Sequence, residues 1–185
     1  MLKNTFIFCL TLSNIFLYSQ SMYLDSNESM RAYSIVGDYT VNSKLSDEYM
    51  TSVGFSAVLK GNHEFQYIYN NYSSHNNNFN INYKYFVKVS SFFNIFLGLN
   101  NLYENSINDD PDNSYTYGWF GKFSDQNLIF FPFFYRTEFY DSEISYYDAI
   151  GVSILFYDIS LQPEYIKYDN GDSFYRMKFY LWEFE

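Results

Sequence analysis

Alternation of apolar and polar side chains with a period of two residues runs through most of the chain, and it restricts the fold more than any other feature. In the clearest segment, 79 to 89, one phase is apolar and the other is largely polar: Phe79, Ile81, Tyr83, Tyr85, Val87 and Val89 alternate with Asn80, Asn82, Lys84, Phe86 and Lys88. The segments 49 to 59 and 144 to 156 repeat the pattern, and no apolar 3.6-residue period of helical length follows residue 21. Because successive side chains of a strand point to opposite faces, the pattern predicts an all-β protein.

The alternation divides the chain into ten predicted strands. They span 31 to 41, 48 to 60, 63 to 70, 78 to 89, 92 to 101, 114 to 123, 128 to 137, 144 to 156, 159 to 168 and 173 to 184. Connections after the odd-numbered strands are longer and polar, such as 71 to 77 and 102 to 113, whereas those after the even-numbered strands are tight, such as 61 to 62 and 157 to 158. This order predicts antiparallel neighbours, with the longer loops at one end of the sheet and the short turns at the other.

Strands of this length, alternation and even number are typical of a transmembrane β-barrel. A strand tilted by about 45° crosses the hydrocarbon core with roughly 9 to 11 residues, and only a sheet closed on itself leaves no unpaired edge there. On this pattern, residues 31 to 185 resemble the small outer-membrane β-barrel proteins of double-membraned bacteria. The resemblance implies a single antiparallel up-and-down transmembrane barrel of ten strands over 22 to 185, with periplasmic termini and five longer loops outside.

The carboxyl end also bears on this resemblance. Barrels of this class commonly finish on an aromatic residue in an amphipathic last strand, which their assembly machinery recognises. This chain ends Phe179-Tyr180-Leu181-Trp182-Glu183-Phe184-Glu185, so its aromatic residue is penultimate. The resemblance implies the barrel-assembly machinery as a partner, while the sequence leaves open which phase of this last strand faces the lipid.

The amino end reads as an export signal. Lys3 is the only charged residue of 1 to 21, Phe6 to Leu17 forms an apolar core, and Tyr18 to Ser21 offers small residues for cleavage. A core of this length fits the roughly 7 to 15 residues of a signal peptide and is shorter than the about 20 of a spanning helix. We expect cleavage after Ser19 or Ser21; an uncleaved anchor is the alternative. The only cysteine, Cys9, lies in this segment, so the mature domain contains none.

Charge is unevenly distributed in the sequence. With 21 acidic and 11 basic residues the net charge is −10, which argues against a nucleic-acid partner. The predicted long loops, counted with Glu48 at a strand end, carry about half of the acidic residues. They contain Asp47, Glu48, Glu104, Asp109, Asp110, Asp112, Glu138, Asp141, Glu143, Asp169 and Asp172 against Lys44 alone. We therefore expect acidic loops. From the resemblance to outer-membrane barrels we expect the outer-membrane lipid as the main partner and a monomeric protein.

If the apolar phase faces lipid, the other phase points into the lumen and carries the strand charges. We expect a lumen charge network of Asp38, Glu64, Lys84, Lys88, Lys122, Arg136 and Glu164, and the same phase of the last strand would add Arg176 and Lys178. Side chains just fill a barrel of about eight strands, whereas aqueous channels belong to about 16 or more. Ten strands therefore predict a lumen filled by ion pairs, with a small anion-preferring channel as the alternative.

A soluble barrel must be weighed against the membrane barrel. A secreted lipocalin-like barrel or β-sandwich shows similar alternation, with its apolar phase pointing inward to a core or an apolar ligand. Such a protein would carry more charge on the wet faces of its strands than the Ser, Gly and Asn seen here. We therefore expect the bacterial outer membrane as the location, with a periplasmic or secreted protein as the alternative.

Catalytic and metal motifs have little support. Lipid A deacylases resemble this protein in size and use a His with a Ser two residues on, but Phe65 follows His63 at that spacing and Asn77 follows His75. The acidic segment 108 to 113 lacks the Gly and the distal Glu of a helix-loop-helix calcium site. We expect no catalytic residue, metal or cofactor, and a structural or surface-interaction role; a lipid-modifying enzyme is the least favoured alternative.

Overall fold

The computed structural model describes residues 31–44, 48–60, 62–73, 77–103, 112–125, 128–140 and 144–184, all of which lie in strands, turns or short connections. The strands are β1 (Arg31–Asn42), β2 (Tyr49–Leu59), β3 (His63–Tyr72), β4 (Asn78–Lys88), β5 (Phe93–Tyr103), β6 (Asp112–Gly121), β7 (Phe123–Asp125), β8 (Leu128–Phe139), β9 (Tyr146–Phe156), β10 (Ile159–Tyr168) and β11 (Ser173–Phe184). In these residues no helix is long and apolar enough to cross a membrane. The predicted signal peptide, 1 to 21, lies outside the described residues.

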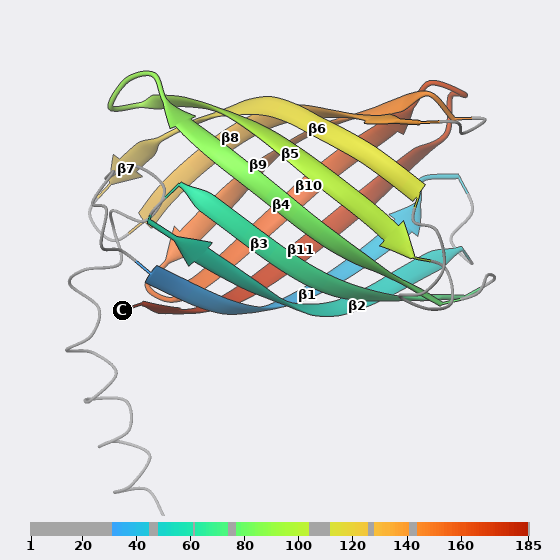
Figure 1. Cartoon of the computed structure of the whole chain (residues 1–185), viewed down its shortest axis with the longest axis horizontal. Coiled ribbons are helices and arrows are strands. Elements are labelled where there is room, and N and C mark those ends of the chain that lie inside the picture. The colour runs from blue at the N-terminus through green and yellow to red at the C-terminus, as the bar shows by residue number, and fades with distance from the viewer. Residues whose placement is uncertain are drawn as a thin grey trace, which may run out of the picture.

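The strands form one closed antiparallel barrel (Figure 1). Apart from β6 and β7, strands that are consecutive in the chain pair with each other, and β1 pairs with β11 from Ala32↔Phe184 to Asn42↔Phe174, which closes the sheet. β6 and β7 both pair with β8, so they share one position in the wall and the barrel has ten. The predicted count of ten antiparallel strands is confirmed, and each predicted end lies within two residues of the observed one, apart from a break in one strand.

The break separates β6 from β7 at Lys122, inside the predicted strand 114 to 123. Pairing with β8 stops at Phe120↔Phe133 and resumes at Phe123↔Phe130. Pro132 lies in β8 opposite this break and has no N–H to donate, so a regular ladder cannot form there. The wall is therefore continuous in space although one strand is interrupted.

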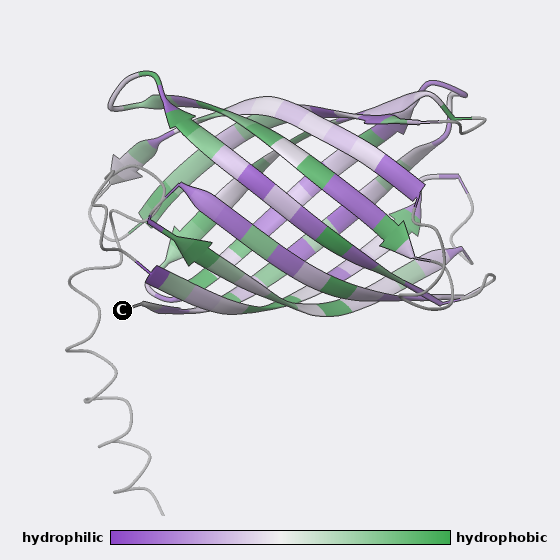
Figure 2. Cartoon of the chain, viewed as in Figure 1, coloured by the Kyte–Doolittle hydropathy of each residue, from purple (hydrophilic) through white to green (hydrophobic). Residues whose placement is uncertain are grey.

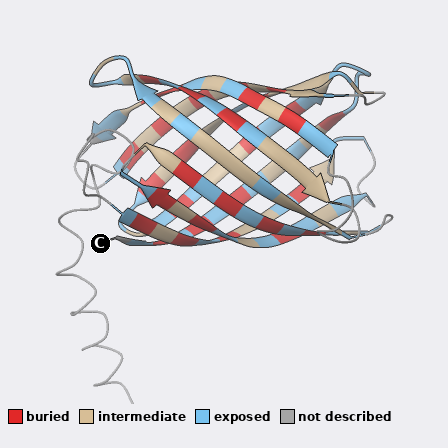
Figure 3. Cartoon of the chain, in the orientation of Figure 1, coloured by how far each residue is buried: buried red, intermediate tan, exposed pale blue. Residues whose placement is uncertain are grey.

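The apolar phase of the strands faces outward. The strands carry both hydrophobic and hydrophilic residues (Figure 2), and buried and exposed residues alternate along many of them (Figure 3). Large side chains on this face remain well exposed, for example Leu97 at 62% and Val53 at 58%. The predicted apolar phases of 49 to 59 and 79 to 89 lie on this face. On β11, which the sequence left open, Phe179 and Leu181 face outward. Tyr180 and Trp182 on the same strand face inward, so β11 places large apolar side chains on both sides of the wall.

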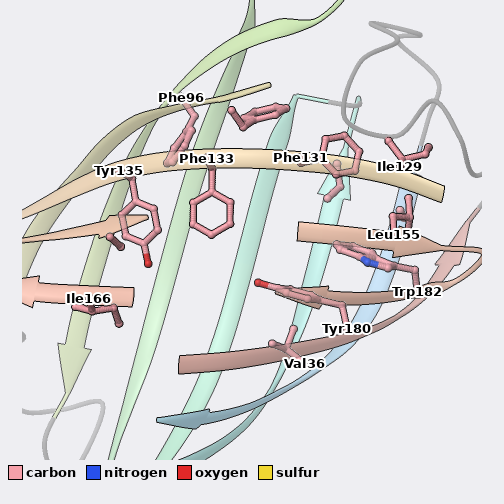
Figure 4. Packing of buried hydrophobic residues seen from close by; sticks show 14 residues of the cluster. Val36, Phe96, Ile129, Phe131, Phe133, Tyr135, Leu155, Ile166, Tyr180 and Trp182 are labelled. Atoms are coloured by element: carbon pink, nitrogen blue, oxygen red, sulfur yellow. The ribbon is translucent and has the colours of Figure 1, made fainter. Parts of the chain in front are cut away.

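The inside of the barrel is apolar at the end where the short turns lie (left in Figure 1). We call Ala32, Val58, Ile129, Leu155 and Trp182 the apolar plug; each is at most 3% exposed, and all belong to one packed cluster (Figure 4). Trp182 Nε1 donates a hydrogen bond to Ser160 Oγ at 3.0 Å, so the buried indole N–H is satisfied. This finding differs from the expectation of a lumen filled by ion pairs.

Two glycines allow close packing against large residues of β8. A Cβ atom on Gly118 would lie 2.6 Å from Tyr135 Cβ, and one on Gly151 would lie 2.7 Å from Phe133 Cζ. Both distances are far shorter than a normal van der Waals contact, about 3.5–4.0 Å between carbons. The absence of a side chain at Gly151 therefore leaves room for the ring of Phe133, and its absence at Gly118 lets this strand approach the backbone and Cβ of Tyr135 closely.

Candidate functional site

A cavity of about 440 Å³ occupies the lumen beyond the apolar plug. Its lining runs from Phe120 and Phe131, next to the plug, to Glu48, Leu102 and Phe139 at the loop ends of their strands. None of the five plug residues contributes to the lining. The cavity is thus bounded by packed apolar side chains on the turn side and extends toward the loops.

One wall of the cavity is aromatic. Phe96, Phe120, Phe131 and Phe133, from β5, β6 and β8, form what we call the aromatic wall. Phe96 and Phe120 have ring centroids 6.5 Å apart, and Phe120 meets Phe131 edge-on at 6.2 Å. Offset and edge-on contacts of this kind are the favoured geometries of aromatic pairs. The wall therefore offers a rigid apolar surface to the cavity.

Glu164 is the centre of the charged side of the cavity. Its side chain is 0% exposed, and its Oε2 accepts hydrogen bonds from Tyr135 Oη at 2.9 Å and from Arg176 Nε at 2.9 Å. Its Oε1 is 3.1 Å from Lys178 Nζ and also accepts a hydrogen bond from Gln162. A buried carboxylate is tolerated when its lone pairs are filled in this way. Glu164 thus has its hydrogen-bonding capacity committed to the protein.

Glu64 forms a second buried carboxylate site on β3. Glu64 Oε1 accepts hydrogen bonds from Ser56 Oγ at 2.9 Å and Gln66 Nε2 at 2.7 Å. Lys84 Nζ lies 3.6 Å from Glu64 Oε2, directly across the β3–β4 register. This distance gives an ion pair without a hydrogen bond. Glu64 and Lys84 therefore neutralise each other inside the barrel.

Asp38 differs from these two carboxylates. It lines the cavity from β1, is only half-buried, and among the described residues accepts one side-chain hydrogen bond, from Thr40 Oγ1 at 3.0 Å. Arg176 and Lys178 act on it electrostatically, but none of the ion pairs between described residues includes Asp38. Asp38 therefore retains acceptor capacity on the cavity side.

A chain of packed rings on β8 to β11 lines one side of the cavity near the loops. We call Phe139, Tyr147, Tyr168 and Phe174 the loop-end ring cluster; all four line the cavity. Ring centroids are 5.8 Å apart for Phe139 and Tyr147, 5.1 Å for Tyr147 and Tyr168, and 5.5 Å for Tyr168 and Phe174. Tyr72 lines the cavity as well and is an electrostatic neighbour of Asp38. Aromatic rings from β3 and from β8 to β11 therefore line the same cavity as this carboxylate.

Most of the charges expected in the lumen line the cavity. They are Asp38, Glu64, Lys84 and Glu164, together with Arg176 and Lys178. Lys88 lies on the inward phase at the turn end of β4, is exposed and does not line the cavity. Lys122 lies at the break between β6 and β7, is half-buried and is also absent from the lining. The structure therefore brings together four of the seven named residues.

The placement of Arg136 in the lumen is wrong. Its neighbours Tyr135 and Thr137 are buried and line the cavity, so Arg136 points to the outer face of β8. There its Nε and terminal nitrogen donate to Asp148 at 2.7 and 2.9 Å, and its guanidinium lies 4.1 Å from the centre of the Tyr146 ring. In 128 to 139 both phases are rich in aromatic residues, which conceals the phase that faces inward.

Sequence reasoning missed Tyr135 and Gln162, which both donate to Glu164. It also missed the aromatic wall, since Phe was assigned to the lipid side. The signal that could have found these rings is the pairing of Gly118 with Tyr135 and of Gly151 with Phe133, where a glycine lies opposite a large ring on the neighbouring strand. That signal requires the register, which alternation alone does not provide.

The histidines and the acidic loop form no site in the described part of the chain. His63 Nδ1 lies 2.8 Å from Tyr83 Oη on the outer face, while His75 lies outside the described residues. Of the segment 108 to 113 only Asp112 and Asn113 are described. Within the described ranges, no three His, Cys, Asp or Glu side chains are arranged to hold a metal ion.

Comparison with known proteins adds no relative to this picture. No protein-family model matches the chain, and no curated protein matches it. A function must therefore be argued from the barrel, its outer face and its cavity.

Proposed function

We propose that this protein is an integral β-barrel of the bacterial outer membrane with a structural or surface-interaction role. The observation that carries the proposal is that charged side chains lie inside the barrel and apolar ones outside, the opposite of a water-soluble protein. Six charged residues line the lumen cavity in the ten-stranded part of the barrel, whereas the middle of the outer face is apolar. A barrel that folds in water would show the reverse, since charge is costly to bury and apolar area is costly to expose.

Charges on the outer face lie at its two ends. Among strand residues whose burial is described, the outward-facing charges are Arg31 and Glu183 at the turn end and Arg136, Glu138, Asp148 and Lys167 at the loop end. Between them the outer face carries residues such as Ile35, Phe55, Leu97 and Leu161. A band of this kind, bounded by charged rims, is typical of transmembrane barrels.

Tyrosines gather on the outer face near the loop end. They include Tyr39, Tyr49, Tyr115, Tyr117, Tyr140, Tyr146 and Tyr175. Tyr117 Oη donates to Glu138 Oε1 at 2.7 Å, and Tyr115 donates to the other oxygen of the same carboxylate. Tyrosine suits the boundary between hydrocarbon and water because its ring is apolar and its hydroxyl is polar. The Glu138 and Arg136–Asp148 clusters thus fit the outer headgroup level.

The short turns then face the periplasm and the acidic loops face outward. A structural or surface-interaction role fits this arrangement better than a small-solute channel, because the apolar plug fills the lumen at the turn end. An interior of packed side chains leaves no continuous path of water there. An apolar ligand inside a soluble barrel is also less favoured, because the cavity contains six strand charges.

The location is tested by fractionating cells that express the full chain and by gel mobility with and without boiling. We expect the protein in the outer-membrane fraction, with a mobility that changes on boiling, because a closed barrel resists dodecyl sulfate until it is heated. A periplasmic protein of similar size serves as the fractionation control. Recovery in the soluble periplasmic or culture fraction would refute the membrane proposal.

A further inference from the structure

We propose that the lumen cavity is a binding site for a small organic ammonium ion with an apolar body. The ammonium group binds Asp38 among the rings near the loops, and the apolar body lies along the aromatic wall. This site lies inside the lumen, so it is present whether or not the barrel spans a membrane. Four observations support it.

The first observation is the state of the carboxylates. Glu164 accepts hydrogen bonds from Arg176, Tyr135 and Gln162 and forms an ion pair with Lys178. Glu64 accepts hydrogen bonds from Ser56 and Gln66 and forms an ion pair with Lys84. Among the described residues, Asp38 accepts a side-chain hydrogen bond only from Thr40 and forms none of the ion pairs. A charged N–H donor in the cavity can therefore hydrogen-bond Asp38 without breaking a bond of the protein. Charge-assisted bonds of this kind are about twice as strong as neutral ones.

The second observation is the aromatic surround. The loop-end ring cluster and Tyr72 line the same cavity as Asp38, and Tyr72 is its electrostatic neighbour. The face of an aromatic ring attracts a cation, and several rings around one position are a known means of binding organic ammonium ions. An anion gains nothing from these ring faces. The rings and the Asp38 carboxylate thus favour the same sign of ligand charge.

The third observation concerns size and shape. The cavity volume of about 440 Å³ falls in the roughly 300–1,000 Å³ range of small-molecule pockets. The aromatic wall provides an apolar surface nearer the turn end of the barrel than Asp38, and the apolar plug closes the cavity on the turn side. A ligand that combines one cationic group with one apolar body matches both parts. A bare metal cation would leave the aromatic wall unused.

The fourth observation is the charge around the cavity mouth. Arg136, Glu138, Asp148 and Lys167 lie on the outer face. The other described charged residues at the loop end are Glu48, Asp112, Asp169 and Asp172, together with Lys44, which pairs with Asp172. Glu48 itself lines the cavity. An acidic rim raises the local concentration of cations and repels anions. Inside the barrel, Lys84 pairs with Glu64, whereas Arg176 and Lys178 share Glu164, so an anionic probe must be compared with the cationic one.

Isothermal titration of the refolded barrel tests this inference, with 2-phenylethylammonium as probe in a nonionic sugar-headed detergent. 3-Phenylpropionate and 2-phenylethanol provide an anionic and a neutral probe with similar apolar bodies. Asp38→Asn removes the charge but keeps an oxygen for Thr40, and Glu183→Gln removes a charge from the exposed turn end of β11. Both variants are first checked for the boiling-dependent mobility of the wild type, so that a folding defect is separated from a binding defect.

We expect saturable binding of the ammonium probe, weakened about tenfold or more by Asp38→Asn and changed less than about twofold by Glu183→Gln. The anionic and neutral probes should bind more weakly than the ammonium. Absence of saturable ammonium binding would overturn the inference, as would equal losses in the two variants. Tighter binding of the carboxylate probe would also overturn it and would indicate Lys84, Arg176 and Lys178 as the recognition groups.

Discussion

Replacement of Glu164 by Ala is expected to lower the free energy of unfolding by about 3–5 kcal/mol, the usual effect of removing one partner from a buried ion pair. Arg176 and Lys178 would lose the carboxylate that compensates them, and Tyr135 and Gln162 would lose their acceptor. Urea unfolding of the barrel in lipid vesicles, followed by tryptophan fluorescence, measures the change. Glu164→Gln should fall between Ala and wild type, because it keeps two hydrogen-bonding atoms.

The matched control for Glu164 is Glu183→Ala, at the exposed turn end of β11. An exposed substitution of this kind changes stability by roughly 0.5 kcal/mol or less. If Glu164→Ala were no more destabilising than this control, the carboxylate would not organise the lumen, and the network around it would have no role in stability.

Replacement of Leu97 by Arg is expected to have the second large effect. Leu97 is 62% exposed at the middle of β5 and lies between Tyr85 and Tyr117 on neighbouring strands. At the bilayer midplane an Arg on the lipid face costs about 2–4 kcal/mol, whereas an exposed substitution in water changes stability by roughly 0.5 kcal/mol or less. The same unfolding experiment in vesicles distinguishes these values.

Thr51→Arg provides the control for position in the membrane. Thr51 also faces outward, but it lies at the loop end of β2, where the cost of Arg falls to about 0–1 kcal/mol. Equal and small effects of the two substitutions would contradict a lipid-facing belt. A larger effect at Leu97 alone would agree with the proposed depth of the two positions.

The strand map could be predicted from the sequence because each strand has one apolar phase. In 79 to 89 the alternation is unbroken, so the strand, its ends and its outward face all follow from it. Closure followed from the even count and the sorted loops, and it is confirmed by the pairing of β1 with β11. Local alternation was enough for these features because it depends only on residues two positions apart.

The interior could be predicted only in part, because it depends on register and on residues far apart in the chain. Asp38 lies opposite Lys178 only because the first and last strands pair. Arg136 was misplaced because β8 carries aromatic residues on both faces, and the aromatic wall was missed for the same reason. Gly118 lies opposite Tyr135 and Gly151 lies opposite Phe133, and no short-range pattern records these cross-strand pairs.

Lipid exposure of the outer face is the central claim, and the chain contains two tryptophans that test it. Trp119 faces outward on β6 and is 39% exposed, whereas Trp182 lies in the apolar plug at 3%. Both lie toward the turn ends of their strands. Trp182→Phe and Trp119→Phe each leave one fluorophore, and vesicles of lipids brominated in the acyl chains quench tryptophans that touch lipid. We expect strong quenching when only Trp119 remains and weak quenching when only Trp182 remains; equal, weak quenching of both would contradict the membrane-spanning barrel.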